Sequence, residues 1–239
     1  MRFAEDVHIQ CSTVPTIPGC KIVASLQQPK CLTMNKSIDT IIFDLGGVLI
    51  DWSPRYVYRK IFKTEEETEW FLENVTTSEW NENQDVGYPL HKATEELVAK
   101  HPEWEPEIKA YYGRWLEMLG DQIHETVEIL QQLKKTGKYE LYALTNWSTE
   151  TFPHALERFE FFKMFEGIVV SGEEKIKKPS AAFYKIIIDR YHLDPSKTVF
   201  IDDSLRNVKG AEAVGITGIH FHNPSQLKEA LQRMGIEIF

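Results

Sequence analysis

The chain has 239 residues, of which 42% are hydrophobic and 26% are charged, which is the composition of an ordinary globular protein. Its formal net charge of −9 disfavours broad electrostatic contact with phosphate backbones, so we expect no nucleic-acid partner. No stretch approaches the roughly 20 apolar residues that span a bilayer, and the N-terminus lacks the apolar region of a secretion signal. We therefore expect a cytoplasmic protein that has no membrane partner.

Residues 1–33 have no clear hydrophobic period and contain several prolines. Cys11, Cys20 and Cys31 all lie here, and their spacing matches no zinc-binding pattern. We expect an N-terminal extension that is largely flexible and takes no part in catalysis.

The first buried strand is expected at residues 40–43, where Ile41, Ile42 and Phe43 form a short apolar run. Asp44 follows directly, and a glycine pair, Gly46 and Gly47, allows a tight turn and close approach of a ligand to the backbone. Asp44 would then lie at the carboxyl end of a central strand, where open α/β sheets bind ligands. A single Asp after a strand is also common as a turn or capping residue, so the later motifs of the chain are needed to distinguish this role from a catalytic one.

Residues 52–121 are rich in aromatic residues and almost free of strand signals. Ser53-Pro54 is typical of a helix start, and helices are predicted over residues 55–62, 65–74, 89–100 and 105–119. This stretch predicts a small all-α domain inserted into a core made of residues 34–51 and 122–239. Some aromatic side chains could line a substrate surface or could simply form the core of the inserted domain: Trp80, Tyr88, Tyr111, Tyr112 and Trp115.

From residue 124 onward, helices and strands alternate. Helices are predicted over residues 124–135, 149–159, 181–191, 205–214 and 225–234, and strands over 140–144, 167–170, 198–201 and 217–220. Such alternation is typical of a parallel sheet with helices on both faces. The predicted fold class is therefore α/β, a Rossmann-like core of about five parallel strands with a small helical domain.

Polar groups follow these later strands as Asp44 follows the first. Thr145-Asn146 ends one strand, Lys177-Lys178-Pro179 follows the next, and Asp202-Asp203 ends a third. Because the carboxyl ends of parallel strands meet at one edge, a nucleophilic carboxylate, a hydroxyl, a cation and a carboxylate pair should lie together. That set of groups indicates phosphoryl transfer or metal-assisted hydrolysis.

These stretches resemble the four motifs of the haloacid dehalogenase-like (HAD) hydrolase superfamily, in the same order. They read Asp44-Leu45-Gly46-Gly47-Val48, Leu144-Thr145-Asn146, Lys178-Pro179 and Ile201-Asp202-Asp203-Ser204. The resemblance runs from about Met34 to the C-terminus. It implies a phosphatase-type core whose inserted helical domain acts as a cap that closes over the site and selects the substrate.

The resemblance implies that Asp44 is the nucleophile and that Mg²⁺ is the cofactor. The metal ligands would be Asp44, the backbone carbonyl of Gly46, and the pair Asp202 and Asp203, one of the pair directly and the other often through water. We favour Asp203 as the direct ligand. Hard oxygen donors of this kind suit Mg²⁺, which offsets the repulsion between an attacking carboxylate and a phosphate.

The same resemblance assigns the phosphoryl-binding groups. Thr145 would bind the transferring oxygens, with help from the backbone of Asn146 and of Gly47. Lys178 would neutralise charge on Asp44 and on the phosphoryl group. The adjacent Lys177 is more simply explained as a residue of a surface turn.

One position departs from the commonest family pattern. Most HAD phosphatases carry a second Asp two residues after the nucleophile as general acid and base, and here that position is Gly46. Asp51 is the nearest replacement along the sequence, although an ordinary turn or salt-bridge role explains it equally well. A missing general acid typically lowers the rate by ~10²–10⁴-fold.

We therefore predict a Mg²⁺-dependent phosphatase that acts on a small phosphorylated metabolite, a sugar phosphate being one candidate. One alternative is a catalytically weak relative that binds a phosphometabolite or a protein partner, which the absence of a side chain at Gly46 favours. Another is a 2-haloacid dehalogenase, which needs no metal and has little reason to keep both Asp202 and Asp203.

Overall fold

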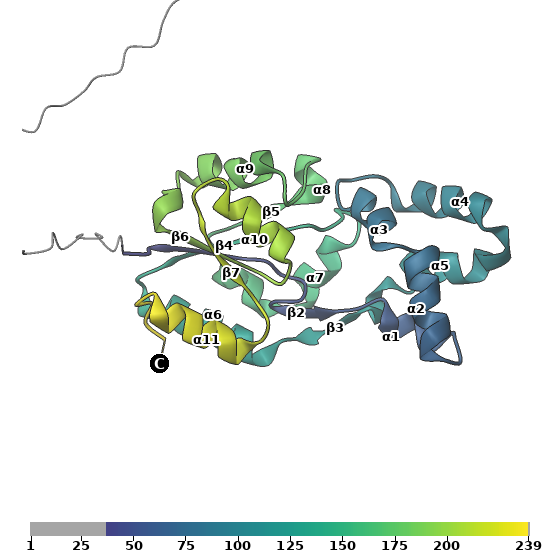
Figure 1. The fold of residues 1–239 in the computed structure, drawn as a ribbon, viewed down its shortest axis with the longest axis horizontal. Coiled ribbons are helices and arrows are strands. Elements are labelled where there is room, and N and C mark those ends of the chain that lie inside the picture. The colour runs from purple at the N-terminus through teal and green to yellow at the C-terminus, as the bar shows by residue number, and fades with distance from the viewer. Residues whose placement is uncertain (1–36, 239) are drawn as a thin grey trace, which may run out of the picture. The chain divides into compact units, whose positions relative to one another are not determined.

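The computed structural model of the protein describes residues 37–238 (Figure 1). Our predictions for residues 1–33, including the three cysteines, lie outside these residues. Within the described part of the chain, five parallel strands form a sheet in the order β5-β4-β1-β6-β7. They are β1 (Thr40–Phe43), β4 (Glu140–Thr145), β5 (Gly167–Val170), β6 (Thr198–Asp202) and β7 (Thr217–His220). The predicted α/β fold with a parallel sheet is confirmed.

The central strand β1 is buried on both faces because successive side chains point in opposite directions. Ile41 and Phe43 join one apolar cluster, and Ile42 joins the other. All three side chains are fully buried. The apolar run of β1 therefore anchors two hydrophobic layers at once, which fixes the position of Asp44 after the end of the strand.

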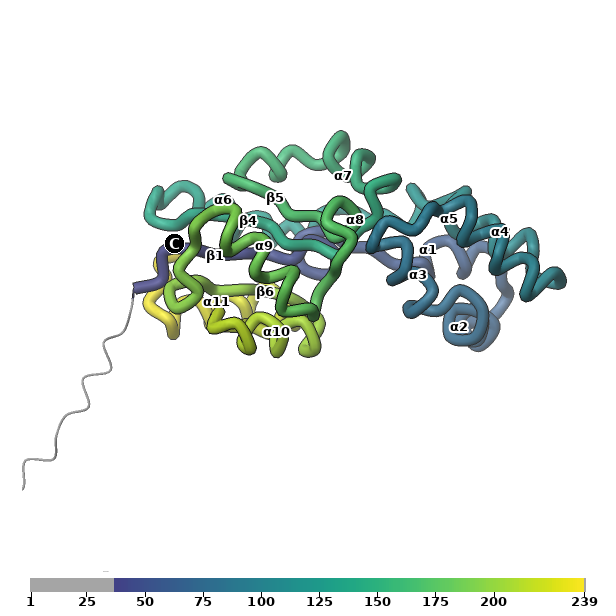
Figure 2. The backbone as a smooth tube through the Cα atoms, turned by 90° about the horizontal axis from the view of Figure 1, so that it is seen from above, coloured from purple at the N-terminus to yellow at the C-terminus, as the bar shows by residue number. Residues whose placement is uncertain are grey.

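Helices cover both faces of the sheet (Figures 1 and 2). The cluster with Ile41 and Phe43 takes in side chains of α6 (His124–Thr136), α7 (Phe152–Arg158) and α11 (Pro224–Arg233). The cluster with Ile42 takes in side chains of α9 (Ala181–Tyr191) and α10 (Leu205–Glu212). A short helix, α8 (Ser171–Glu174), follows β5 directly. The helix α6 ends at Thr136 and is capped by Gly137, which takes the left-handed conformation with φ 63°.

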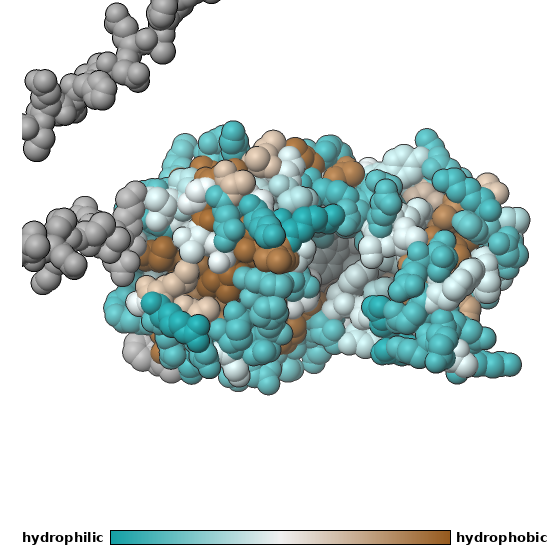
Figure 3. Space-filling view, viewed as in Figure 1, coloured by the Kyte–Doolittle hydropathy of each residue, from teal (hydrophilic) through white to brown (hydrophobic). Residues whose placement is uncertain are grey.

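Between the strands β2 (Ile50–Trp52) and β3 (Leu119–Gln122) lies a stretch that we call the helical segment, residues 53–118. Its helices are α1 (Arg55–Tyr58), α2 (Glu65–Asn74), α3 (Ser78–Gln84), α4 (Leu90–Lys100) and α5 (Glu105–Gly113), and they gather at one end of the part of the chain that the structure describes (Figure 1). An aromatic cluster stabilises it, with Phe71 packed 4.8 Å from Tyr58 and 5.6 Å from Trp104 between ring centroids. The surface is hollowed between this segment and the sheet-containing part (Figure 3).

The two stretches of chain that connect the sheet to the helical segment pair with each other. The strand β2 (Ile50–Trp52) is antiparallel to β3 (Leu119–Gln122). This ribbon corrects the helix predicted over residues 105–119, which ends at Gly113, a poor helix former, before Leu119 enters the strand. The helix predicted over 55–62 is also shorter and ends at Tyr58.

No helix among residues 37–238 is both long and apolar enough to cross a bilayer.

Candidate active site

The strand ends bring Asp44, Thr145 and Asp202 to one edge of the sheet. Phe43 pairs with Ala143 on one side and with Ile201 on the other, so Asp44 and Asp202 follow at the same level and Thr145 lies one residue further along β4. The Asp44 N–H donates to the carbonyl of Ile201 at 2.8 Å, which continues the strand pairing to the site itself. All three side chains are buried: Asp44, Thr145 and Asp202. The edge predicted from the sequence is therefore formed.

Lys178 joins two of these carboxylates. Its Nζ lies 2.8 Å from Asp44 Oδ1 and 2.7 Å from Asp202 Oδ2, and its side chain is fully buried. The loop that carries Lys178 is held by Asn146, whose Oδ1 accepts from the Lys178 N–H at 2.9 Å. The Asn146 amide also donates to the Lys178 carbonyl at 3.2 Å. Lys178 therefore reaches the carboxylates from a backbone position that a neighbouring strand end determines.

The cluster carries an excess of negative charge. Burial raises the pKa of Asp44 well above its ordinary value, and the nearby carboxylates of Asp202 and Asp203 add to this, while Lys178 opposes it. Burial alone would lower the pKa of Lys178, but Asp202 and Asp44 outweigh burial and raise it, so the ammonium keeps its proton. One lysine faces three acidic groups, and a divalent cation would complete the charge balance.

The donor set also fits such a cation. Carboxylate oxygens of Asp44, Asp202 and Asp203 lie within 4.8 Å of one another, and hard oxygen donors are the ligands that Mg²⁺ prefers. The Asn207 amide donates to both oxygens of Asp202 at 3.1 Å, and the Ser204 N–H donates to Oδ1 at 2.8 Å. The buried Asn207 Oδ1 has no hydrogen-bond partner among the described residues. This buried oxygen is suited to accept a hydrogen bond from a water molecule that is bound to the metal ion.

The two glycines after Asp44 have different roles. Gly47 takes the left-handed conformation with φ 73°, and a methyl group there would collide with the Asp203 carboxylate. Gly46 is unconstrained, because no atom of the described chain lies within 4 Å of the place that a β-carbon would occupy. Space for a side chain thus exists at the position where most HAD phosphatases have their second Asp.

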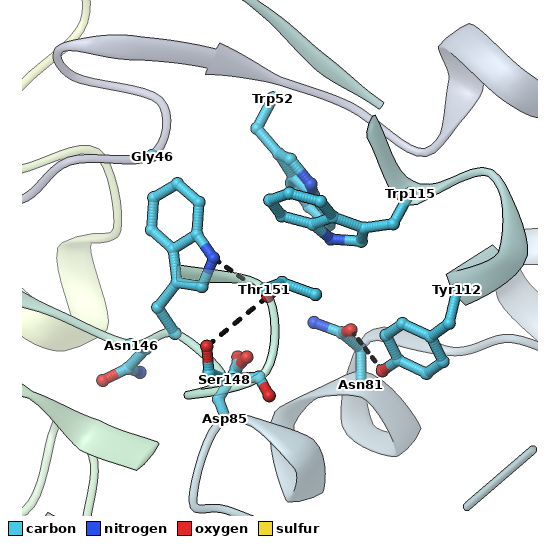
Figure 4. Close-up of a pocket in the computed structure, with 10 residues that line it drawn as sticks. Gly46, Trp52, Asn81, Asp85, Tyr112, Trp115, Asn146, Ser148 and Thr151 are labelled. Carbon is cyan, nitrogen blue, oxygen red and sulfur yellow. Dashed lines mark hydrogen bonds between the residues drawn. The ribbon is translucent and has the colours of Figure 1, made fainter. Parts of the chain in front are cut away.

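A cavity of about 100 Å³ opens from Gly46 and Asn146 toward the helical segment. Aromatic and polar side chains from both parts line it (Figure 4). The aromatic ones are Trp52, Tyr112, Trp115 and Trp147, and the polar ones are Asn81, Asp85, Ser148 and Thr151. A substrate whose phosphate lies at Asp44 would place the remainder of its structure here.

Polar contacts join α3 to the sheet-containing part beside this cavity. Glu82 accepts from Lys177 Nζ at 2.7 Å and from Arg206 at 2.8 Å. The hydroxyl of buried Ser171 donates to the backbone carbonyl of Asp85 and accepts from the Trp147 N–H at 2.9 Å. Lys177 therefore holds the helical segment and is not simply a residue of a solvated turn.

Asp51 is not brought to the cavity. It lies on β2 next to Trp52, and neighbouring side chains on a strand point to opposite sides. Trp52 lines the cavity, whereas Asp51 is exposed and accepts a hydrogen bond from the Tyr56 hydroxyl.

Asp85 also lines the cavity, and no sequence pattern predicted it. This residue caps the C-terminus of α3 and lies in the turn Asp85-Val86-Gly87, which looks in the sequence like an ordinary polar turn. Only the packing of α3 on the sheet-containing part brings it to the cavity. Of the aromatic candidates, Tyr112 and Trp115 line this cavity, while Trp80 and Tyr88 line a different one.

Fold and site together define an α/β enzyme with an acidic, cation-suited centre at the carboxyl ends of its parallel strands. The family described as haloacid dehalogenase-like hydrolase matches residues 38–215. The chain belongs to this family of hydrolases, as its four motifs predicted.

Relatives with curated names include phosphatases. A sesquiterpene phosphatase of Aspergillus oryzae is 27% identical over 179 residues, which cover 75% of this chain and 87% of the relative. A phosphorylated carbohydrates phosphatase of Thermotoga maritima is 23% identical over 77% of this chain and 84% of its own length. A HAD family enzyme of Bacteroides thetaiotaomicron, solved as a magnesium complex, is 25% identical with a TM-score of 0.61. That match covers 79% of this chain and 95% of the other.

Proposed function

We propose that this protein is a Mg²⁺-dependent phosphatase that hydrolyses a small phosphorylated metabolite through an aspartyl-phosphate on Asp44. The observation that carries the proposal is the buried Asp44–Lys178–Asp202 array, with the Asp203 carboxylate beside it. A 2-haloacid dehalogenase, which needs no metal, has little reason to keep both Asp202 and Asp203 beside Asp44. Relatives named as phosphatases support the same reaction class.

In this mechanism an Asp44 carboxylate oxygen attacks phosphorus and the leaving group departs on the opposite side. Lys178 reduces the negative charge on Asp44 and on the phosphoryl oxygens. The Thr145 hydroxyl and the backbone N–H groups of Asn146 and Gly47 donate to those oxygens. Water then hydrolyses the aspartyl-phosphate and frees Asp44 for the next turnover.

When bound, Mg²⁺ supplies the positive charge that lets two anions react. Its ligands in our proposal are Asp44, the Gly46 carbonyl and Asp203, with Asp202 acting through water. The division between the two aspartates follows from their partners. Asp202 already accepts from Lys178, Asn207 and Ser204, whereas the Asp203 residue is exposed at the site.

We propose that residues 52–121 act as the substrate-selecting cap on a core of residues 34–51 and 122–239. The cavity is small, about 100 Å³, which favours a metabolite over a polymer. Its lining combines aromatic faces, such as Trp52 and Trp115, with amide and hydroxyl groups, such as Asn81 and Thr151. A sugar ring matches that combination, because its C–H face packs on an aromatic ring while its hydroxyls form hydrogen bonds.

The test measures phosphate release from p-nitrophenyl phosphate and from a panel of sugar phosphates, with Mg²⁺ and with EDTA. We expect turnover that EDTA removes and that Asp44→Asn abolishes. An exposed carboxylate of α9, Asp189, provides the matched control Asp189→Asn, which should hydrolyse like the wild type. Turnover that persists in Asp44→Asn would rule out the covalent mechanism.

A catalytically weak protein that binds a phosphometabolite is the second candidate. The missing side chain at Gly46 favours it, since the usual acid is absent there. If the wild type binds Mg²⁺ and phosphate by calorimetry but hydrolyses none of the esters, this second function replaces the first.

A further inference from the structure

A phosphatase of this kind must protonate its leaving group. When the P–O bond of an alkyl phosphate breaks, the electron pair stays on an oxygen that is a poor leaving group without a proton. Gly46 has no side chain to donate one, and Asp51 is exposed and bonded to Tyr56. The proposed function therefore leaves one catalytic position to be filled.

Asp85 lies where such a group is needed. It lines the same cavity as Gly46, which is two residues after Asp44, and Asn146, which is next to Thr145 (Figure 4). The nucleophile and the leaving oxygen lie on opposite sides of phosphorus, so the leaving oxygen faces away from Asp44 and toward this cavity. The carboxyl group of Asp85 has no hydrogen-bond or ion-pair partner among residues 37–238, and is therefore free to bond a substrate oxygen.

The backbone around Asp85 is well anchored. Ser171 donates to its carbonyl, and Glu82, one helical turn earlier, accepts from both Lys177 and Arg206. These contacts come from the sheet-containing part, so they fix the end of α3 relative to the strand ends. A general acid requires such fixed geometry.

We propose that Asp85 is the general acid and base of this enzyme and replaces, from the helical segment, the side chain missing at Gly46. This inference rests on the proposed phosphatase function. In the first step an oxygen of Asp44 bonds to phosphorus, the ester P–O bond breaks, and the Asp85 proton passes to the departing oxygen to give the alcohol. In the second step the Asp85 carboxylate takes a proton from water, the water oxygen bonds to phosphorus, and the Asp44–phosphorus bond breaks to give inorganic phosphate.

The electrostatic environment agrees with this role. Burial raises the pKa of Asp85 to about 7; Glu82 adds to the rise, while Lys177 and Lys178 oppose it. A carboxyl group that titrates near neutral pH can donate a proton in one step and accept one in the next.

The experiment compares kcat/KM for p-nitrophenyl, phenyl and benzyl phosphate, whose leaving groups share a ring but become steadily more basic. For Asp85→Asn we expect a loss of ~10²–10⁴-fold with benzyl phosphate and a much smaller loss with p-nitrophenyl phosphate, which needs no acid. In the double variant Asp85→Asn with Gly46→Asp, benzyl phosphate hydrolysis should recover in part, because Gly46 has room for the side chain. Asp51→Asn should not show the graded loss.

Equal losses on all three esters would mean that Asp85 is only structural, and a graded loss in Asp51→Asn would assign the acid to that residue; both overturn the proposal. If Asp85→Asn does not fold, the wild-type pH profile decides. We expect kcat/KM for benzyl phosphate to fall above about pH 7 while that for p-nitrophenyl phosphate falls less, and parallel profiles would overturn the proposal. No wild-type turnover even of p-nitrophenyl phosphate would count against the phosphatase itself, which separates the two failures.

Discussion

The side-chain amide of Asn146 forms hydrogen bonds with both backbone polar groups of Lys178. Its oxygen accepts from the Lys178 N–H at 2.9 Å, and its nitrogen donates to the Lys178 carbonyl at 3.2 Å. The family resemblance suggested only a backbone role for Asn146. The structure adds a side-chain role, since this pair connects the end of β4 to the loop that delivers the buried lysine.

Asn146→Ala should therefore impair catalysis through Lys178. We expect kcat to fall by about 10²-fold, because a shift of 1 Å in a catalytic group has an effect of that size. Steady-state kinetics with p-nitrophenyl phosphate measures it. The control is Asn74→Ala, which removes an exposed amide bonded only to the Trp70 carbonyl of its own helix. Unchanged kcat in Asn146→Ala would show that Lys178 does not depend on this pair.

Gly47 should tolerate no side chain. In Gly47→Ala the methyl group meets the Asp203 carboxylate, so we expect Mg²⁺ affinity to fall at least tenfold (~1.4 kcal/mol) in calorimetry. Gly235→Ala is the matched control, because Gly235 has a similar φ of 75° with no described atom near its β-carbon position. It shares the backbone strain without the collision. If both variants bind Mg²⁺ equally, backbone strain and not a collision with Asp203 is the reason for a glycine at position 47.

Trp52 should contribute to substrate binding more than to chemistry. Trp52→Ala removes one aromatic wall of the cavity, and we expect KM for a sugar phosphate to rise about tenfold with little change in kcat. Acetyl phosphate, which has no ring to pack there, should show no such rise. Trp70→Ala removes a half-exposed tryptophan of α2 and serves as the control. A fall in kcat with KM unchanged would contradict the assignment.

The ionised carboxylate of Asp85 should destabilise the folded state at neutral and alkaline pH. Its pKa rises from 3.8 to about 7 on folding, so the folded state binds this proton more tightly than the unfolded state. The associated stability is present below pH 3.8 and is lost as the pH rises to about 7. Asp85→Asn should therefore raise Tm more at pH 8 than at pH 5, measured by thermal unfolding without added metal. Equal shifts at both values would show that the carboxyl group titrates normally in the fold.

The sequence was sufficient for the parts of the site that local patterns determine. Asp44, Thr145 and Asp202 each end a short apolar strand, and parallel pairing then brings strand ends together without further information. The Lys178-Pro179 motif has no such strand, and the resemblance to a family was needed to place it. The five core strands were predicted within one residue of their observed ends.

Asp85 could not be predicted because no local pattern marks it. Its position depends on contacts between residues far apart in the chain, such as Lys177 with Glu82 and Ser171 with the Asp85 carbonyl. The β2–β3 ribbon was missed for a related reason. Its strands are three and four residues long, and β3 contains Gly120 and Asp121, so neither shows an alternating apolar pattern.

The position of Glu82 between Lys177 and Arg206 has a kinetic consequence. Any separation of α3 from the strand ends, which would widen the way into the cavity, must break the ionic contact that Glu82 makes with two bases. Salt screens such contacts, whereas the buried Asp44–Lys178 pair is sheltered from it. Ionic strength should therefore change the rates of substrate entry and product release and leave the rate of phosphoryl transfer nearly constant.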